Sequence, residues 1–203
     1  MIAPLNDTLR KLPTWIIYVG VALYIVWEFY LAATQSGRYV VEPINELERE
    51  YGKAALIALV SGLALTPVRN FTGLNLIKFR RAIGLASFFL VMAHFLVWML
   101  LDLQAVAQIW TQIVKHPYVT VGFLALLMMV PLAITSNDRS IRKLGALRWR
   151  RLHKLNYLIV VLGGLHYLWL VKGFQIEPIL YLVMIGGLLG LRLVWAQRRA
   201  KAR

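Results

Sequence analysis

Histidines are the residues of this sequence whose type and position most directly suggest chemistry. The chain has four histidines and no cysteine, so disulfides, thiolate metal sites and iron–sulfur clusters are excluded, and any redox metal needs other ligands. His94 and His166 each lie inside a long apolar run, where ionisable side chains are rare and usually functional. Two neutral imidazoles that face each other in apolar surroundings can provide the axial ligands of a b-type haem.

His153 is a further candidate haem ligand. It lies 13 residues before His166, and 13 helical steps of about 100° leave two side chains about 140° apart. A second haem near His153 would therefore need helix distortion or another ligand. Arg81 and Arg80, 13 and 14 residues before His94, could pair with haem propionates or lipid phosphates, or could simply be basic residues at a membrane surface. The sequence is compatible with one haem or two.

Six apolar segments must position these histidines. The chain has 203 residues, of which 60% are hydrophobic, and its mean hydropathy is +0.65, which is too apolar for a soluble domain. The segments are continuously apolar and not alternating, which favours helices over barrel strands. They cover residues 15–33, 54–68, 82–101, 119–134, 155–171 and 178–195. We predict an all-α, polytopic membrane protein: a six-transmembrane-helix bundle that forms one domain over residues 1–203.

Basic residues are distributed unevenly between the two sides of this bundle. Of 23 Lys and Arg, 18 fall on one side and 5 on the other, which predicts cytoplasmic termini by the positive-inside rule. The net charge of +14 therefore reflects topology in a lipid bilayer, and we expect no nucleic-acid partner. With a rise of about 1.5 Å per residue, His94 and His166 lie about 18 Å and 20 Å from the inner surface, at one depth. His116, in an outer loop, is expected to have no ligand role.

Several neighbouring features carry expectations of their own. Gly163, Gly164 and Gly84 would let a flat macrocycle approach the helix backbones. The acidic first outer loop could form a short helix over residues 43–52 along the outer membrane surface. Glu28, near the outer end of the first segment, is expected to reach the interface by snorkelling.

Short motifs follow one another in order along nearly the whole chain. They are Pro43 with Gly52, Thr66-Pro67-Val68-Arg69, Arg80-Arg81-Ala82-Ile83-Gly84-Leu85, His94, Pro117-Tyr118, Leu144-Gly145, Trp149, Leu152-His153, Tyr157 and His166-Tyr167-Leu168-Trp169. Each motif is weak alone, but the ordered set resembles the MsrQ (YedZ) family of haem-binding membrane subunits, within the ferric-reductase-like transmembrane group. The resemblance implies that His94, His153 and His166 bind haem.

The resemblance also implies a function. Members of this family are electron-transfer subunits of the bacterial inner membrane that carry haem b, one or two per chain, and are associated with FMN. Their implied partner is a periplasmic MsrP-like molybdoenzyme that reduces methionine sulfoxide in oxidised envelope proteins. Only 8 residues follow residue 195 and no GxGxxG motif is present, so we expect no nicotinamide domain. Electrons would come from quinol or from a cytoplasmic flavin reductase, for which the basic segment 139–154 could be a docking surface.

Other functions stay open at this point. The nearest alternative is another ferric-reductase-like protein or a dihaem cytochrome b. A transporter would explain buried polar residues such as Glu28 and Asn156, but no inverted repeat is visible. A structural subunit, whose histidines only hydrogen-bond between helices, would explain everything except the common depth of His94 and His166. A reducible b-type absorption spectrum would separate the electron carrier from the other two.

Overall fold

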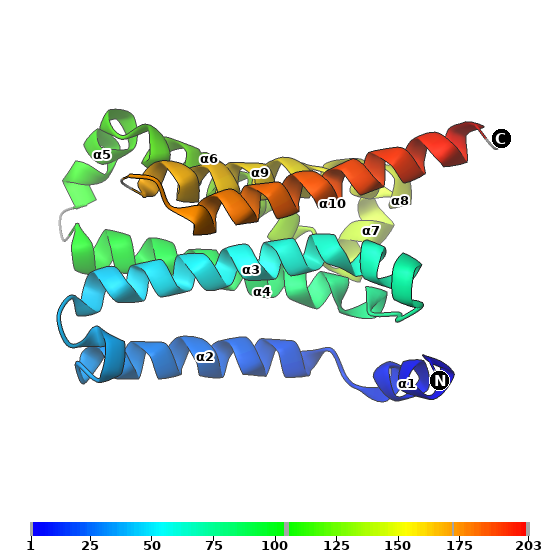
Figure 1. Ribbon diagram of the computed structural model, residues 1–203, viewed down its shortest axis with the longest axis horizontal. Helices are drawn as coiled ribbons and strands as arrows, with labels where there is room; N and C mark the ends of the chain where they lie inside the picture. The colour runs from blue at the N-terminus through cyan, green and yellow to red at the C-terminus, as the bar shows by residue number, and fades with distance from the viewer. Residues whose placement is uncertain (1, 104–105, 172, 202–203) are drawn as a thin grey trace.

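The structure of the chain is a bundle of long helices (Figure 1). This computed structural model describes residues 2–103, 106–171 and 173–201, and no strand occurs within these ranges. The all-α fold class is therefore confirmed. Lys172 and Arg203, which contributed to the count of basic residues, lie outside the described residues.

Six helices form the body of the bundle. They are α2 (Trp15–Ala33), α3 (Pro43–Thr72), α4 (Arg80–Val97), α6 (Pro117–Ile134), α9 (Leu155–Leu170) and α10 (Ile176–Lys201). Five of them, all except α9, are long and apolar enough to cross a membrane. Helix α9 has 16 residues, so it is about 24 Å long, shorter than a hydrocarbon core of about 30 Å. It nevertheless packs along α6 and α10, and the chain is a multi-pass membrane protein.

Shorter elements lie at the two ends of the bundle (Figure 1). Helix α5 (Ile109–Lys115) marks one end, which we call the α5 end. Both chain termini lie at the opposite end, which we call the terminal end, together with α1 (Ile2–Lys11), α7 (Asp138–Leu144) and α8 (Ala146–Leu152). The remaining short turns are η1 (Gly37–Tyr39), η2 (Ile77–Phe79), η4 (Val106–Gln108) and one turn of π-helix, η3 (Trp98–Asp102).

Helix α3 differs from its expected limits at its first turns. The separate surface helix expected over residues 43–52 is wrong, because these residues are the beginning of a continuous helix of 30 residues. Pro43 stands at its start, where a fixed φ suits a helix and a missing N–H does no harm. Leu47 and Tyr51 are 1% and 2% exposed, so packing holds these turns in the bundle. The helix ends at Gly73, which adopts the left-handed conformation with φ +77°.

Two apolar clusters hold the bundle together. The larger cluster joins α3, α6, α9 and α10 through residues such as Leu59, Leu63, Ile159 and Ile185. The smaller cluster includes Tyr39 and joins α2, η1, α3 and α4. The outward faces of the helices expose many apolar side chains, as expected for surfaces that contact hydrocarbon.

Candidate haem-binding site

His94 is oriented by the backbone of α3. Its Nδ1 lies 2.8 Å from the carbonyl oxygen of Glu48. Because a carbonyl oxygen can only accept a hydrogen bond, Nδ1 must carry the proton and Nε2 is left as the free, neutral nitrogen. Gly52 lies one turn further along α3, and a Cβ atom there would be 3.1 Å from this Nδ1. The missing side chain allows the imidazole to come close to the α3 backbone.

His166 is oriented in the same way by the backbone of α6. Its Nδ1 lies 2.7 Å from the carbonyl oxygen of Tyr118, so this imidazole also presents an unprotonated Nε2. Gly122 lies one turn further along α6, and a Cβ atom there would be 2.6 Å from the same Nδ1. Hydrogen bonds of this kind fix the tautomer and ring orientation of metal-binding histidines.

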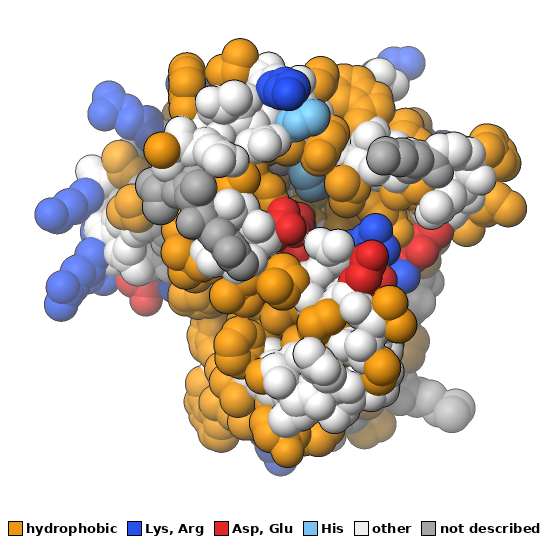
Figure 2. All heavy atoms as spheres, turned by 90° about the vertical axis from the view of Figure 1, so that its left-hand side faces the viewer, with side chains coloured by type: hydrophobic (Ala, Val, Ile, Leu, Met, Phe, Trp, Pro, Cys, Tyr) orange, Lys and Arg blue, Asp and Glu red, His pale blue; other side chains and the backbone are white. Residues whose placement is uncertain are grey.

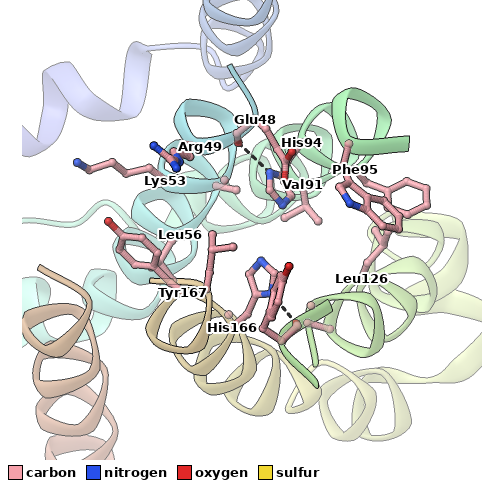
Figure 3. A pocket seen from close by; sticks show the side chains of 18 of the residues that line it. Glu48, Arg49, Lys53, Leu56, Val91, His94, Phe95, Leu126, His166 and Tyr167 are labelled. Carbon is pink, nitrogen blue, oxygen red and sulfur yellow. Dashed lines mark hydrogen bonds between the residues drawn. The ribbon is translucent and has the colours of Figure 1, made fainter. Parts of the chain in front are cut away.

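The two imidazoles face each other across a cavity near the α5 end of the bundle, which we call the α5-end cavity. Their ring centroids are 6.0 Å apart and their planes are nearly perpendicular, at 78°. Figure 3 shows both rings directed into the space between α4 and α9. Two metal–nitrogen bonds of about 2 Å each would place imidazole centroids about 6 Å apart on opposite sides of one metal ion. The spacing fits axial ligation of a single haem iron.

The surroundings of the pair also fit a haem. The α5-end cavity has a volume of about 830 Å³, within the range of about 300–1,000 Å³ typical of cofactor pockets. Its walls include apolar side chains such as Leu56, Val91 and Leu126 (Figure 3). Among the described residues no group of three or more His, Cys, Asp or Glu could hold a bare metal ion. Two nitrogens in an apolar slot suit a metal whose remaining ligands come from a macrocycle.

Charged residues surround the mouth of the α5-end cavity. Glu48, Arg49, Lys53 and Asp102 all line it. Figure 2, which faces the α5 end, shows acidic and basic side chains gathered near the middle of this end, beside histidine side chains. Lys53 forms an ion pair of 2.5 Å with Glu177 of α10. The polar groups of a bound cofactor would meet charged partners here and not in the apolar interior.

Of the three glycines expected to form the haem slot, the structure places one there. Gly163 lines the α5-end cavity. Gly164 instead packs against α10, since a Cβ atom there would lie 2.7 Å from the side chain of Leu182. Gly84 lines a different cavity at the other end of the bundle. Sequence depth alone did not identify Gly52 and Gly122, which the structure places against the histidine rings.

His153 is not brought to the His94–His166 pair. It lies between α8 and α9 and lines a second cavity of about 580 Å³, which we call the terminal-end cavity. Its ring stacks on Trp149 with centroids 3.9 Å apart, and its Nε2 lies 3.1 Å from Oγ1 of Thr135. Burial and the nearby charge of Arg81 lower the pKa of His153, which favours the neutral form that could bind iron.

His116 lies between α5 and α6. Its ring is 5.6 Å from that of Tyr118, and it is not among the residues that line the α5-end cavity. The structure therefore does not bring it to the His94–His166 pair.

Glu28 does not snorkel to the interface as expected. It is 5% exposed and accepts hydrogen bonds from Tyr39 at 2.6 Å and from Arg38 at 3.0 Å. Arg38 also forms an ion pair of 2.6 Å with Glu50 of α3. The carboxylate is retained inside the bundle because an adjacent arginine and a tyrosine hydroxyl satisfy it. This network ties η1 to α2 and α3 beside the α5-end cavity, which Arg38 also lines.

Comparisons with known proteins match most of the chain. Residues 51–164 match the family described as ferric reductase like transmembrane component. The chain is 40% identical over 181 residues to the protein-methionine-sulfoxide reductase heme-binding subunit MsrQ of Brucella anthropi, covering 89% of this chain and 81% of that relative. It is 41% identical over 180 residues to the subunit of the same name from Brucella ovis, covering 88% and 80% of the two chains.

Proposed function

Because this chain belongs to the ferric-reductase-like transmembrane family, among the MsrQ haem-binding subunits, we propose that it is a haem b electron-transfer subunit of a methionine sulfoxide reductase system. In this proposal His94 and His166 would hold the haem iron. The observation that carries it is the 6.0 Å separation of two imidazole rings whose Nδ1 atoms are both bound to backbone carbonyls.

The residues of the chain have distinct tasks in this proposal. A b-type haem supplies one-electron redox chemistry when it is bound. The two imidazoles would hold it from α4 and α9, and the carbonyls of Glu48 and Tyr118 leave each Nε2 free to bind. The apolar wall excludes water and thereby influences the reduction potential.

The proposed location is the bacterial inner membrane, with both termini in the cytoplasm. The basic residues support this orientation, because α1, α7, α8 and the last turns of α10 all lie at the terminal end (Figure 1) and all carry Lys or Arg. By the positive-inside rule this end faces the cytoplasm. The α5 end and the His94–His166 pair then lie toward the periplasm.

The proposed acceptor is a periplasmic molybdenum-dependent methionine sulfoxide reductase of the MsrP type, which would repair oxidised envelope proteins. The name of the similar Brucella subunits supports a link to methionine sulfoxide reduction. The proposed donor is membrane quinol or a cytoplasmic flavin reductase. An association with FMN is proposed from the family resemblance.

We also propose a haem-related role for His153 on the cytoplasmic side. The α5-end and terminal-end cavities share Leu59 and Met129 as lining residues, so a group in one cavity would be separated from a group in the other by little more than a layer of side chains. Iron measured per purified chain tests this role. A value near two supports a second haem, and a value near one contradicts a complete second site.

The main test is an absorption spectrum of the purified protein with three single substitutions. His94→Ala and His166→Ala should each abolish the reducible low-spin b-type signal, because one axial ligand is lost. His116→Ala is the matched control and should keep it, since His116 does not line the α5-end cavity. Wild-type spectra from both His94→Ala and His166→Ala would contradict the proposed ligand pair.

A further inference from the structure

Helix α1 carries an apolar stripe that the rest of the protein leaves largely uncovered. Its members, which recur at the spacing of one helix face, are Ile2, Leu5, Leu9 and Leu12. The N–H of Leu12 donates to the carbonyl of Thr8, so the helical path continues through this residue. None of the described residues of α1 is buried, and Leu5 and Leu12 are 48% and 41% exposed. Because a helix of 10 residues is only marginally stable in water, α1 needs contacts beyond its own hydrogen bonds.

One side of α1 is held by the turn between α3 and α4. The side-chain amide of Asn6 donates to the carbonyl of Gly73 at 3.1 Å, and its oxygen accepts from the N–H of Asn75 at 2.8 Å. Ile2 faces the same turn, since a Cβ atom on Gly73 would lie 3.5 Å from its Cδ1. Asn6 and Leu5 are about 100° apart around the helix axis. The contacts that fix α1 to the turn therefore leave the side that carries Leu5 free.

Charged residues occupy the side of α1 away from the leucines. Asp7, Arg10 and Lys11 lie about 120–160° from Leu5 around the helix axis. The side chains of Arg10 and Asp7 are 74% and 68% exposed, and Lys11 is exposed as well. Leucine thus faces one way and charge the other, while the α3–α4 turn lies alongside. A helix that lies in the plane of a membrane surface has this distribution of residues.

The connection to α2 keeps α1 close to the membrane. Residues 12–14 separate Lys11 from Trp15, where the candidate membrane span α2 begins, and a chain of this length reaches about 14 Å at most. Trp15 is 59% exposed, and tryptophan is enriched where a span meets the membrane surface. Only 11% of the spanning part of α2 is buried inside the protein, so hydrocarbon surrounds most of it. Figure 1 shows α1 beside the end of α2.

We propose that α1 lies flat in the lipid leaflet at the terminal end, with Leu5 and Leu12 among the acyl chains and Arg10 and Lys11 at anionic headgroups. Lipid is favoured over a protein partner because the hydrocarbon that surrounds α2 is already within reach of the short connection. In the proposed orientation this is the cytoplasmic leaflet, whose anionic lipids attract basic residues. Because Asn6 joins α1 to the α3–α4 turn, the lipid contact also holds that turn at the membrane surface.

Fluorescent probes on single cysteines test this placement in the full-length chain, which has no natural cysteine. A nitrobenzoxadiazole probe is attached to Leu5→Cys or, as the matched control on the opposite side of α1, to Asp7→Cys, and each protein is reconstituted into vesicles. Lipids with a nitroxide on the upper acyl chain should quench the Leu5→Cys probe at least about twofold more than the Asp7→Cys probe, because an interfacial helix buries its apolar side about 5–10 Å deep. Iodide on both sides of the membrane should quench the two probes in the reverse order.

The basic residues of α1 predict a preference among lipids. Nitroxide quenching of the Leu5→Cys probe should be stronger in vesicles that contain anionic phosphatidylglycerol than in vesicles of phosphatidylcholine alone. Arg10→Gln combined with Lys11→Gln should abolish this difference, because the attraction to anionic headgroups is lost. Arg139→Gln combined with Arg142→Gln, which removes the same charge from exposed positions on α7, should preserve it.

The outcomes separate lipid from other partners. Equal nitroxide quenching of the Leu5→Cys and Asp7→Cys probes would overturn the placement. A Leu5→Cys probe that is shielded from both nitroxide lipid and iodide would also overturn it and would indicate a protein contact. Equal quenching in the two kinds of vesicle would overturn the role of Arg10 and Lys11. Size-exclusion profiles in detergent report whether each variant is folded, and Leu12→Cys replaces Leu5→Cys if the latter misfolds. None of these expected results depends on haem binding.

Discussion

Gly122 lies against the ring of His166 so closely that a Cβ atom on Gly122 would come within 2.6 Å of the ring nitrogen Nδ1. The same nitrogen is bound to the carbonyl of Tyr118, four residues earlier on α6. Gly52 has the corresponding relationship to His94 on α3, at 3.1 Å. In each case the histidine side chain contacts the backbone of a neighbouring helix, and a glycine on that helix leaves the space that the ring needs.

Gly122→Ala should therefore impair haem binding without a direct change to a ligand. A contact below 3.0 Å forces the His166 ring to move, and such overpacking typically costs about 1–3 kcal/mol. We expect haem content per chain, measured from the reduced spectrum, to fall at least about tenfold. Gly186→Ala on α10 is the control, because a Cβ there meets nothing within 4 Å. Wild-type haem content in Gly122→Ala would contradict this role.

Tyr39→Phe should destabilise the fold at the α5 end. It removes the donor that reaches the buried carboxylate of Glu28 at 2.6 Å, and leaving a buried acceptor short of a partner costs about 1–3 kcal/mol. Tyr30→Phe, on α2 and 56% exposed, should change stability little. Thermal denaturation in detergent measures both. Equal midpoints for Tyr39→Phe and wild type would show that Arg38 alone satisfies Glu28.

The Tyr39 hydroxyl should also make the stability of the fold depend on pH. Burial and the hydrogen bond to Glu28 raise the pKa of Tyr39. Because the folded-state pKa lies above the unfolded value of about 10, the stabilisation is fully present below pH ~10 and is lost as the pH rises toward the folded-state pKa. The difference in denaturation midpoint between wild type and Tyr39→Phe should therefore be constant from pH 6 to about 9 and shrink above pH ~10. A difference that grows at alkaline pH would contradict this assignment.

Depth in the bundle could be predicted from the sequence, whereas rotation about the helix axes could not. His94 and His166 were expected at one depth because helical rise is nearly constant, and the structure places their ring centroids 6.0 Å apart. Their role as ligands stays a prediction. Gly84 and Gly164 were expected beside a macrocycle, but a helix can turn any face toward its neighbours, and these two face other surroundings.

Contacts between distant segments explain the other differences. Glu28 was expected at the interface because its partners, Arg38 and Tyr39, cannot be recognised as partners before the first loop is folded against α2. The continuous helix from Pro43 was missed because polar and acidic residues at its beginning are typical of a surface segment. The buried residues among them are Leu47 and Tyr51, which share the smaller cluster with Tyr39 from the first loop.

Topology can be tested with single cysteines, because the natural chain contains none. Thr111→Cys on α5 and Arg139→Cys on α7 place thiols at exposed positions on opposite ends. In intact cells a membrane-impermeant thiol reagent that has passed the outer membrane should label Thr111→Cys and leave Arg139→Cys unlabelled. After the inner membrane is permeabilised, both should react. Labelling of Arg139→Cys in intact cells would reverse the proposed orientation.

Electron flow should run from the terminal end to the α5 end if the chain is a relay. Reduction of one methionine sulfoxide to methionine and water takes two electrons and two protons, so two one-electron deliveries are needed per sulfoxide. In vesicles with the α5 end outward and the b-type haem chemically reduced, addition of an MsrP-type reductase and methionine sulfoxide outside should oxidise the haem. The reductase without sulfoxide should oxidise at most an amount set by its own redox centres. Transfer across this end is favoured because His94 and His166 line the α5-end cavity, so the haem would be held near this end of the bundle. Haem that stays reduced with both additions would exclude the relay.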